Sequence, residues 1–197
     1  MIPADPLPAP GAPRVTPPRT AVVALGSIVM GDDGAGAAVL AALEAGWDLP
    51  RELERLDLGT PGPYFAEYVR DYEQLVVIDA LRSPGEPGEV KCFDESTLRA
   101  VPAGDRLTPH VLDLGEALAR LAFEGRAPAK VRVVGIVPDA VRAGTELSAS
   151  VRSAVPRAAM AVAGALEDLG IEAVRRARSE EPVTWWSRPP RRISPAD

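Results

Sequence analysis

The chain has 197 residues, of which 46% are hydrophobic and 25% charged, proportions typical of one globular domain with a buried core. Twenty-two Lys and Arg against 28 Asp and Glu give a net charge of −6, which argues against the positive surface of a nucleic-acid binder. The single cysteine, Cys92, excludes a disulfide framework and a thiolate metal site, and it predicts a reducing, cytoplasmic location. We expect neither a signal peptide nor a membrane span.

The first structural unit predicted is a strand, a loop and a helix. Residues 1–18 are rich in proline and lack a hydrophobic period, which predicts a disordered lead. The apolar run Thr20–Leu25 predicts a strand buried on both faces. Ala and Leu at helical spacing over residues 35–44 predict a helix, and the glycine-rich loop before it carries Asp32 and Asp33 at the helix entrance.

Strands and helices continue to alternate along the chain. Continuous β-branched and apolar sequence predicts strands at Gln74–Ala80 and Lys130–Ile136. Weaker patterns predict four more elements: a strand at Leu53–Asp57, a helix over Tyr64–Arg70, an edge strand at Glu89–Phe93 and an amphipathic helix over Val111–Phe123. This alternation predicts an α/β fold with a mostly parallel sheet covered by helices on both faces.

The last predicted helix begins after Ser148, a typical N-cap residue, and runs to about Leu169. Pro156 is expected to kink or divide it. The folded domain is therefore predicted to span residues 19–174. Residues 175–197 are basic, rich in proline and aperiodic, which predicts a poorly packed tail.

Acidic residues stand at the ends of two predicted strands. Asp32 and Asp33 follow the first strand, and Asp79 ends the strand at Gln74–Ala80. Because the loops at the carboxyl ends of parallel strands lie along one edge of the sheet, these side chains can converge there. His110, the only histidine, stands before a predicted helix and could complete the set.

Two carboxylates and one imidazole suit nickel, zinc, cobalt or manganese and leave coordination positions open for water or substrate. The plainer alternatives are an acid that caps a helix and a strand-end Asp79 that accepts hydrogen bonds from loop amides. Asp32 could replace Asp33 as a ligand, although helix capping is its expected task. From the residues alone, a metal site and a purely structural set both stay open.

Three further features of the sequence could carry a function. Cys92 alternates with Val90 along the predicted edge strand, which predicts a small buried hydrophobe without a chemical role. The glycine spacing after the first strand fits neither a dinucleotide nor a P-loop motif. The pair Trp185–Trp186 could anchor a partner protein, since Trp dominates interface hot spots, or could belong to the tail.

Taken in order, a series of short motifs resembles the hydrogenase maturation proteases, the peptidases that process the large subunits of nickel-iron hydrogenases. The resemblance extends from about Ala21 to Leu169. Its parts are Gly26–Gly36 (GSIVMGDDGAG), Asp57–Thr60, Val77–Ala80, Pro87–Glu89, Thr108–His110, Val134–Pro138 and Leu147–Ser148.

The resemblance implies a function and a site. It implies a twisted five-stranded sheet sandwiched between helices, and a catalytic, nickel-binding set made of Asp33, Asp79 and His110. The expected substrate and partner is the hydrogenase large-subunit precursor, which would supply the nickel and lose its C-terminal extension. Zinc or cadmium is expected to occupy the same ligands in vitro. Two alternatives are kept: a zinc-dependent peptidase of the same fold and a non-catalytic chaperone that reads nickel.

Overall fold

The computed structural model describes residues 18–94, 97, 109–184 and 186, and the side chains of residues 109–113 are outside that description. The predicted lead therefore falls almost wholly outside the described residues. Within them, no helix combines the length and the apolar run needed to cross a bilayer.

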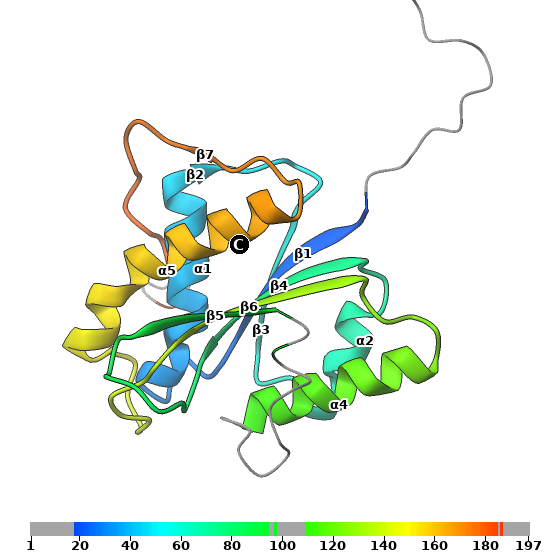
Figure 1. Ribbon diagram of the computed structural model, residues 1–197. Helices are drawn as coiled ribbons and strands as arrows, with labels where there is room; N and C mark the ends of the chain where they lie inside the picture. Colours follow the sequence, from blue (N-terminus) through cyan, green and yellow to red (C-terminus); the bar gives the residue numbers. More distant parts are fainter. Residues whose placement is uncertain (1–17, 95–96, 98–108, 185, 187–197) are drawn as a thin grey trace, which may run out of the picture.

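The centre of the protein is a five-stranded sheet in the order β3-β1-β4-β6-β5 (Figure 1). Its strands are β1 (Thr20–Leu25), β3 (Glu54–Gly59), β4 (Gln74–Ala80), β5 (Val90–Asp94) and β6 (Lys130–Ile136). All neighbours pair in parallel except β5, which lies antiparallel to β6 at the edge of the sheet. Every residue of β1 and β4 is buried, as their continuous apolar sequence predicts.

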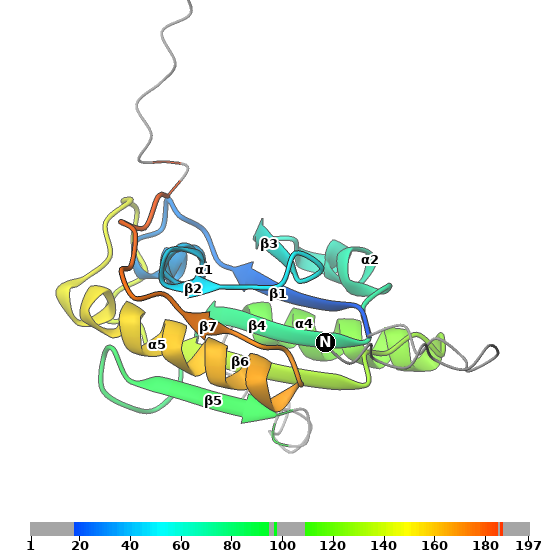
Figure 2. The ribbon, with the colours of Figure 1, turned by 90° about the horizontal axis from the view of Figure 1, so that it is seen from above.

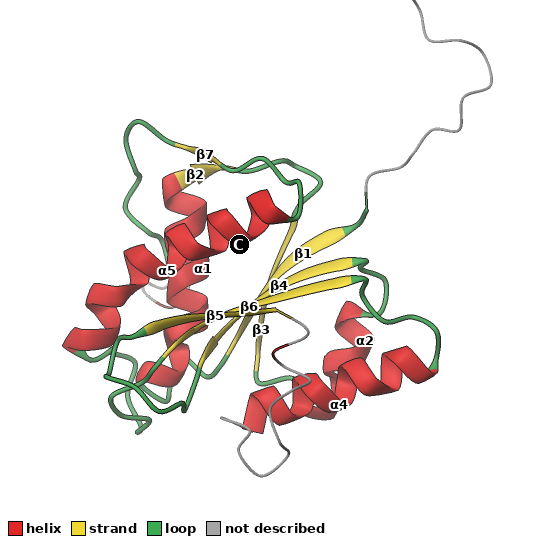
Figure 3. Ribbon diagram, viewed as in Figure 1, coloured by secondary structure: helices red, strands yellow, loops and turns green. Residues whose placement is uncertain are grey.

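Helices cover both faces of the sheet and make three layers (Figure 3). On one face, α1 (Ala35–Gly46) packs against α5 (Ala149–Asp168); on the other, α2 (Phe65–Val69) and its preceding turn η2 (Gly62–Tyr64) pack against α4 (Pro109–Phe123). Because side chains alternate along a strand, β1 serves two cores, with Val22 on the side of α1 and α5 and Val23 on the side of α2 and α4. The predicted three-layer α/β fold is confirmed.

The last long helix, α5, begins after Ser148 and ends next to Leu169, as predicted. Ser148 is its N-cap, and the Ser148 hydroxyl accepts a hydrogen bond from the Val151 amide at 3.4 Å. The predicted division at Pro156 is wrong, because the helix continues through it to Asp168. Pro156 is exposed, so the carbonyl that lacks its helical donor faces the solvent side, where water can satisfy it.

The segment after α5 is docked where an aperiodic tail was predicted. Strand β7 (Val174–Arg175) pairs antiparallel with β2 (Trp47–Asp48) at the end of α1 (Figure 2). The amides of Arg176 and Glu180 then donate to the carbonyls of the last two residues of α1, at 2.9 and 3.0 Å. These helix-end carbonyls have no partner inside the helix, so the segment satisfies them. Residues 187–197 lie outside the described residues.

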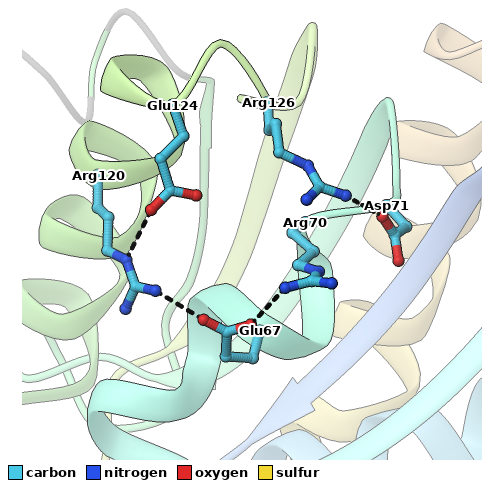
Figure 4. A network of polar contacts seen from close by, with 6 residues as sticks. All are labelled: Glu67, Arg70, Asp71, Arg120, Glu124 and Arg126. Carbon is cyan, nitrogen blue, oxygen red and sulfur yellow. Dashed lines mark hydrogen bonds and ion pairs between the residues drawn. The ribbon is translucent and has the colours of Figure 1, made fainter.

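A network of exposed ion pairs joins α4 to α2 (Figure 4). Glu67 accepts from Arg70 at 2.8 Å and from Arg120 at 2.6 Å, and Arg120 also pairs with Glu124 at 3.0 Å. Because all four side chains are solvated, such pairs add little to stability. The Arg120–Glu67 pair is the member of the network that links α4 to α2.

Candidate active site

The loop after β1, residues 26–34, closes tightly on itself. Gly26 has a φ of 105°, and a Cβ added there would lie 1.9 Å from the Asp33 carbonyl oxygen, so only glycine allows this closure. The Ser27 amide donates to Asp33 Oδ2 at 2.6 Å. Asp33 therefore braces its own loop and makes no side-chain cap to the helix that follows. Its side chain is partly buried.

The first turn of α1 is pressed against the ends of two strands. A Cβ added at Gly36 would lie 2.3 Å from the Leu25 carbonyl oxygen of β1 and 2.9 Å from the Ile78 carbonyl oxygen of β4. Ile78 directly precedes Asp79, and the η1 turn that holds Asp33 (Asp32–Gly34) contacts β4. The backbone segments that carry the two carboxylates thus meet at the carboxyl edge of the sheet.

Asp79 lies deep at this edge. Its exposed fraction is 1%, and its Oδ1 accepts a hydrogen bond from the Ala80 amide at 2.8 Å. It is the next-to-last residue of β4 and pairs in register with Gly135 of β6. A buried carboxylate at the end of a central strand, under glycine-rich loops, is held in a fixed orientation. Such fixed geometry is what a ligand or catalytic group needs.

His110 is the second residue of α4, whereas the sequence suggested a place in the loop before the helix. Pro109 opens the helix, as proline often does at a first helical position, and α4 contacts the η2 turn that follows β3. The imidazole itself is among the side chains outside the description. Among the side chains that are described, no group of three His, Cys, Asp or Glu could hold a metal ion, so the set with His110 stays a prediction.

Asp32 has a task that its position before a helix did not indicate. It is 1% exposed, and its Oδ1 accepts from the Ser148 amide at 2.6 Å, while Oδ2 accepts from the amides of Asp139 and Ala140 at 2.9 and 3.0 Å. All three donors belong to the loop between β6 and α5. Burial raises the pKa of Asp32, but the hydrogen bonds outweigh it and leave the pKa below its ordinary value.

The predicted helix capping by Asp32 is therefore wrong, because both of its oxygens accept hydrogen bonds from the loop between β6 and α5. Next to it, the Gly31 amide donates to the Gly144 carbonyl at 2.7 Å and the Gly144 amide donates to the Val29 carbonyl at 3.0 Å. The loop that carries Asp33 is thus joined to the loop after β6. Sequence reasoning had no signal for this contact, because the partners of Asp32 lie 107 to 116 residues away.

Replacing Asp32 by Asn is expected to lower the free energy of unfolding by about 2–3 kcal/mol at neutral pH, because an NH₂ group would face amide donors and leave buried groups unpaired. Denaturant unfolding measures the change. The exposed neighbour Asp139 is the matched control, and Asp139→Asn should change stability by less than about 0.5 kcal/mol. Equal effects of the two substitutions on stability would contradict the structural role of Asp32.

The same hydrogen bonds of Asp32 predict that stability depends on pH. The pKa of Asp32 is lowered in the folded state. The stabilisation that the ionised Asp32 gives is therefore fully present above the ordinary aspartate pKa of about 3.9, and it is lost as the pH falls through the lower pKa of the folded state. The stability difference between wild type and Asp32→Asn should accordingly shrink on acidification below about pH 4.

Cys92 was predicted to be buried, and this is wrong. It lies on the edge strand β5 with its side chain exposed, because the outer edge of the sheet is incompletely covered. The partial burial that it retains raises the pKa of its thiol, which disfavours the reactive thiolate. As predicted, no chemistry is assigned to it.

The fold and these loops define a class, the three-layer α/β proteins with aspartates at the carboxyl edge of a mostly parallel sheet, and comparison with known proteins identifies the family. The family model for HycI, hydrogenase maturation protease, matches residues 37–165. The matched span includes Asp79 and His110 and begins four residues after Asp33.

Individual relatives agree with the family match. The chain is 30% identical over 159 residues to hydrogenase 2 maturation protease from Escherichia coli, covering 80% of this chain and 96% of that protein. It is 28% identical to the hydrogenase expression/formation protein HupD from Rhizobium leguminosarum, covering 81% and 79%. The solved structure of the hydrogenase maturating endopeptidase HybD from E. coli superposes with a TM-score of 0.71 at 28% identity, covering 80% of this chain and 98% of that one.

The chain therefore belongs to the hydrogenase maturation protease family. It is an enzyme, a protease, on a three-layer α/β fold with a mostly parallel five-stranded sheet.

Proposed function

We propose that this protease recognises nickel in the precursor of a hydrogenase large subunit and removes the C-terminal extension of that precursor. Asp33, Asp79 and His110 would supply ligands to nickel that the precursor carries. The observation that supports this most directly is the contact of the α1 first turn with the ends of β1 and β4, which brings the segments of Asp33 and Asp79 to one edge.

The chemistry of the proposed ligands fits the proposed cargo. Carboxylate and imidazole groups suit borderline divalent metals such as nickel, and three protein ligands leave positions for the groups that the precursor already provides. Nickel belongs to the substrate in this proposal. A precursor without nickel would lose these ligand bonds and bind more weakly, so the protease would distinguish filled from empty precursor by differential affinity.

Nickel recognition and cleavage are linked by proximity. Once the precursor is held through its metal, the peptide bond between mature subunit and extension lies beside the site, and an effectively unimolecular hydrolysis replaces a bimolecular one. Water adds across that amide bond, which releases a new carboxyl end on the subunit and a new amino end on the extension. The loops at the carboxyl edge hold the ligands still during this step.

The test is a cleavage assay with purified precursor, scored by the shift of the large subunit on a denaturing gel. Nickel-loaded precursor should be cut, and the same precursor prepared without nickel should stay intact. Equal cleavage of both would refute nickel recognition, and tight binding of loaded precursor without cleavage would favour the non-catalytic chaperone. Zinc that copurifies at one equivalent and is required for cleavage would favour the zinc-dependent peptidase.

A further inference from the structure

A segment beyond the family match reaches the loop that carries Asp33. The match ends at residue 165, and the segment is made of the described residues 176–184 and 186, here named the C-terminal strap. It follows β7 directly. Arg176 pairs with Asp48 at 2.8 Å, and the Glu180 amide donates a hydrogen bond to a carbonyl at the end of α1. From β7 it passes along the side of the molecule where α1 and α5 lie (Figures 1 and 2).

The far end of the strap lies at the opposite end of α1. Thr184 and Trp186 line a hollow of about 230 Å³. Its other walls come from the loop of residues 26–34 (Ile28, Gly31 and Gly34), the first turns of α1 and α5 (Ala38 and Arg152) and the loop between β6 and α5 (Leu147). Trp186 is partly buried there. The strap thus returns from the last turn of α1 to its first.

The loop that the strap reaches has little packing of its own on the outside. Gly26 and Gly31 both have positive φ, at 105° and 62°, and glycine-rich backbone loses much entropy when it is ordered. Val29 and Met30 point outward, with exposed fractions of 57% and 36%. On its inner side the loop is tied down by Asp32. On its outer side the strap supplies a large, rigid side chain, Trp186, that lines the same hollow as Ile28.

We propose that Trp186 is a positioning residue that holds the loop of residues 26–34 in its observed conformation, in which the Ser27 amide donates to Asp33. An indole has only two side-chain torsions and covers a large area, so it can restrain a neighbouring loop at low entropic cost. Its effect on cleavage rests on the proposed function; its effect on the loop does not.

The direct test is amide hydrogen exchange of residues 27–34 in the full-length protein without precursor. Trp186→Ala should speed exchange there about tenfold, whereas Val183→Ala should leave it unchanged. Val183 is the matched control, because it lies on the same strap with an exposed fraction of 58% and outside the hollow. Trp186→Phe should give an intermediate rate. Exchange in Trp186→Ala equal to that in Val183→Ala would overturn the proposal.

If the alanine variant does not fold, the same comparison between Trp186→Phe and Val183→Ala decides the question, with about a twofold to threefold increase expected for the phenylalanine variant. A double substitution adds a second check. Once Ile28 on the opposite wall is shortened to Ala, removing Trp186 should accelerate exchange by clearly less than tenfold. Independent, fully multiplicative effects would show that Trp186 does not act through this loop.

Precursor cleavage separates positioning from a loss of folded protein. In Trp186→Ala the KM for nickel-loaded precursor should rise about fivefold or more with kcat nearly kept, since a loop that is seldom in place weakens docking. A smaller folded fraction would instead lower the apparent kcat and leave KM unchanged. If the wild-type protein cleaves no precursor, the proposed function fails, and the exchange result still decides the role of Trp186.

Discussion

The full-length His110→Ala variant is expected to stay folded and to leave nickel-loaded precursor uncleaved. Loss of a group that merely supports a metal ligand costs about 10- to 100-fold, so loss of a ligand itself should lower kcat/KM by at least about a hundredfold. The fold should tolerate the change, because position 110 is in the first turn of α4 and alanine is the best helix former. A gel assay of cleavage beside a melting curve measures both effects.

Asp79→Asn should behave in the same way. The amide keeps the oxygen that accepts from the Ala80 amide and nearly the same shape, yet it is a much poorer metal ligand than a carboxylate. Asp71→Asn is the control, since Asp71 is an exposed carboxylate that pairs with Arg126 on the surface, and it should cleave like wild type. If His110 and Asp79 have only structural roles, their variants should lose roughly 1 kcal/mol of unfolding free energy and keep their cleavage activity. Full cleavage by either would remove the metal-reading mechanism.

Gly36→Ala is expected to lower the free energy of unfolding by about 3 kcal/mol, at the upper end of the usual range for overpacking. The added Cβ would stand 2.3 and 2.9 Å from two carbonyl oxygens. Both oxygens belong to the backbone of buried strands, so neither can swing aside as a flexible side chain would. The first turn of α1 must then move away from β1 and β4, and with it the loop that carries Asp33. Denaturant unfolding gives the size of the loss.

A second helical glycine provides the opposite expectation. Gly164 lies in α5, and a Cβ added there would meet nothing within 4 Å. Gly164→Ala should therefore stabilise the protein by up to about 1 kcal/mol through helix propensity alone. A Gly36→Ala variant that unfolds at the same denaturant concentration as Gly164→Ala would show that α1 is not held against the strand ends as described.

Local sequence was sufficient to predict an element wherever the residues of that segment alone determine its structure. The strands Thr20–Leu25, Gln74–Ala80 and Lys130–Ile136 have the predicted bounds, because a strand buried on both faces must be apolar throughout. The Ser148 cap is equally local, since its hydroxyl bonds three residues ahead. The edge position of β5 could also be predicted from sequence, because the alternation of polar and apolar residues along the strand reflects one solvated face.

Other features depend on neighbours that no segment can specify by itself. Cys92 looked apolar enough to be buried, yet its exposure is decided by whether another element covers the sheet edge. Pro156 breaks helices in general, but here it faces solvent, which compensates the missing hydrogen bond. The docking of residues 174–180 needs the unsatisfied end of α1, more than a hundred positions earlier in the chain.

The same distinction between local features and features that depend on distant neighbours applies to the candidate site. Sequence by itself determined that carboxylates stand at strand ends, because strand boundaries and residue identities are local, and the order of the motifs indicated the family. Only the tertiary structure decided which hydrogen-bond donors each of the two adjacent aspartates meets. Both stand at the same helix entrance in the sequence, but the amides of residues 139, 140 and 148 surround Asp32, whereas Asp33 turns back to its own loop. Hydrogen-bond partners brought together by the crossover from β6 to α5 make that difference.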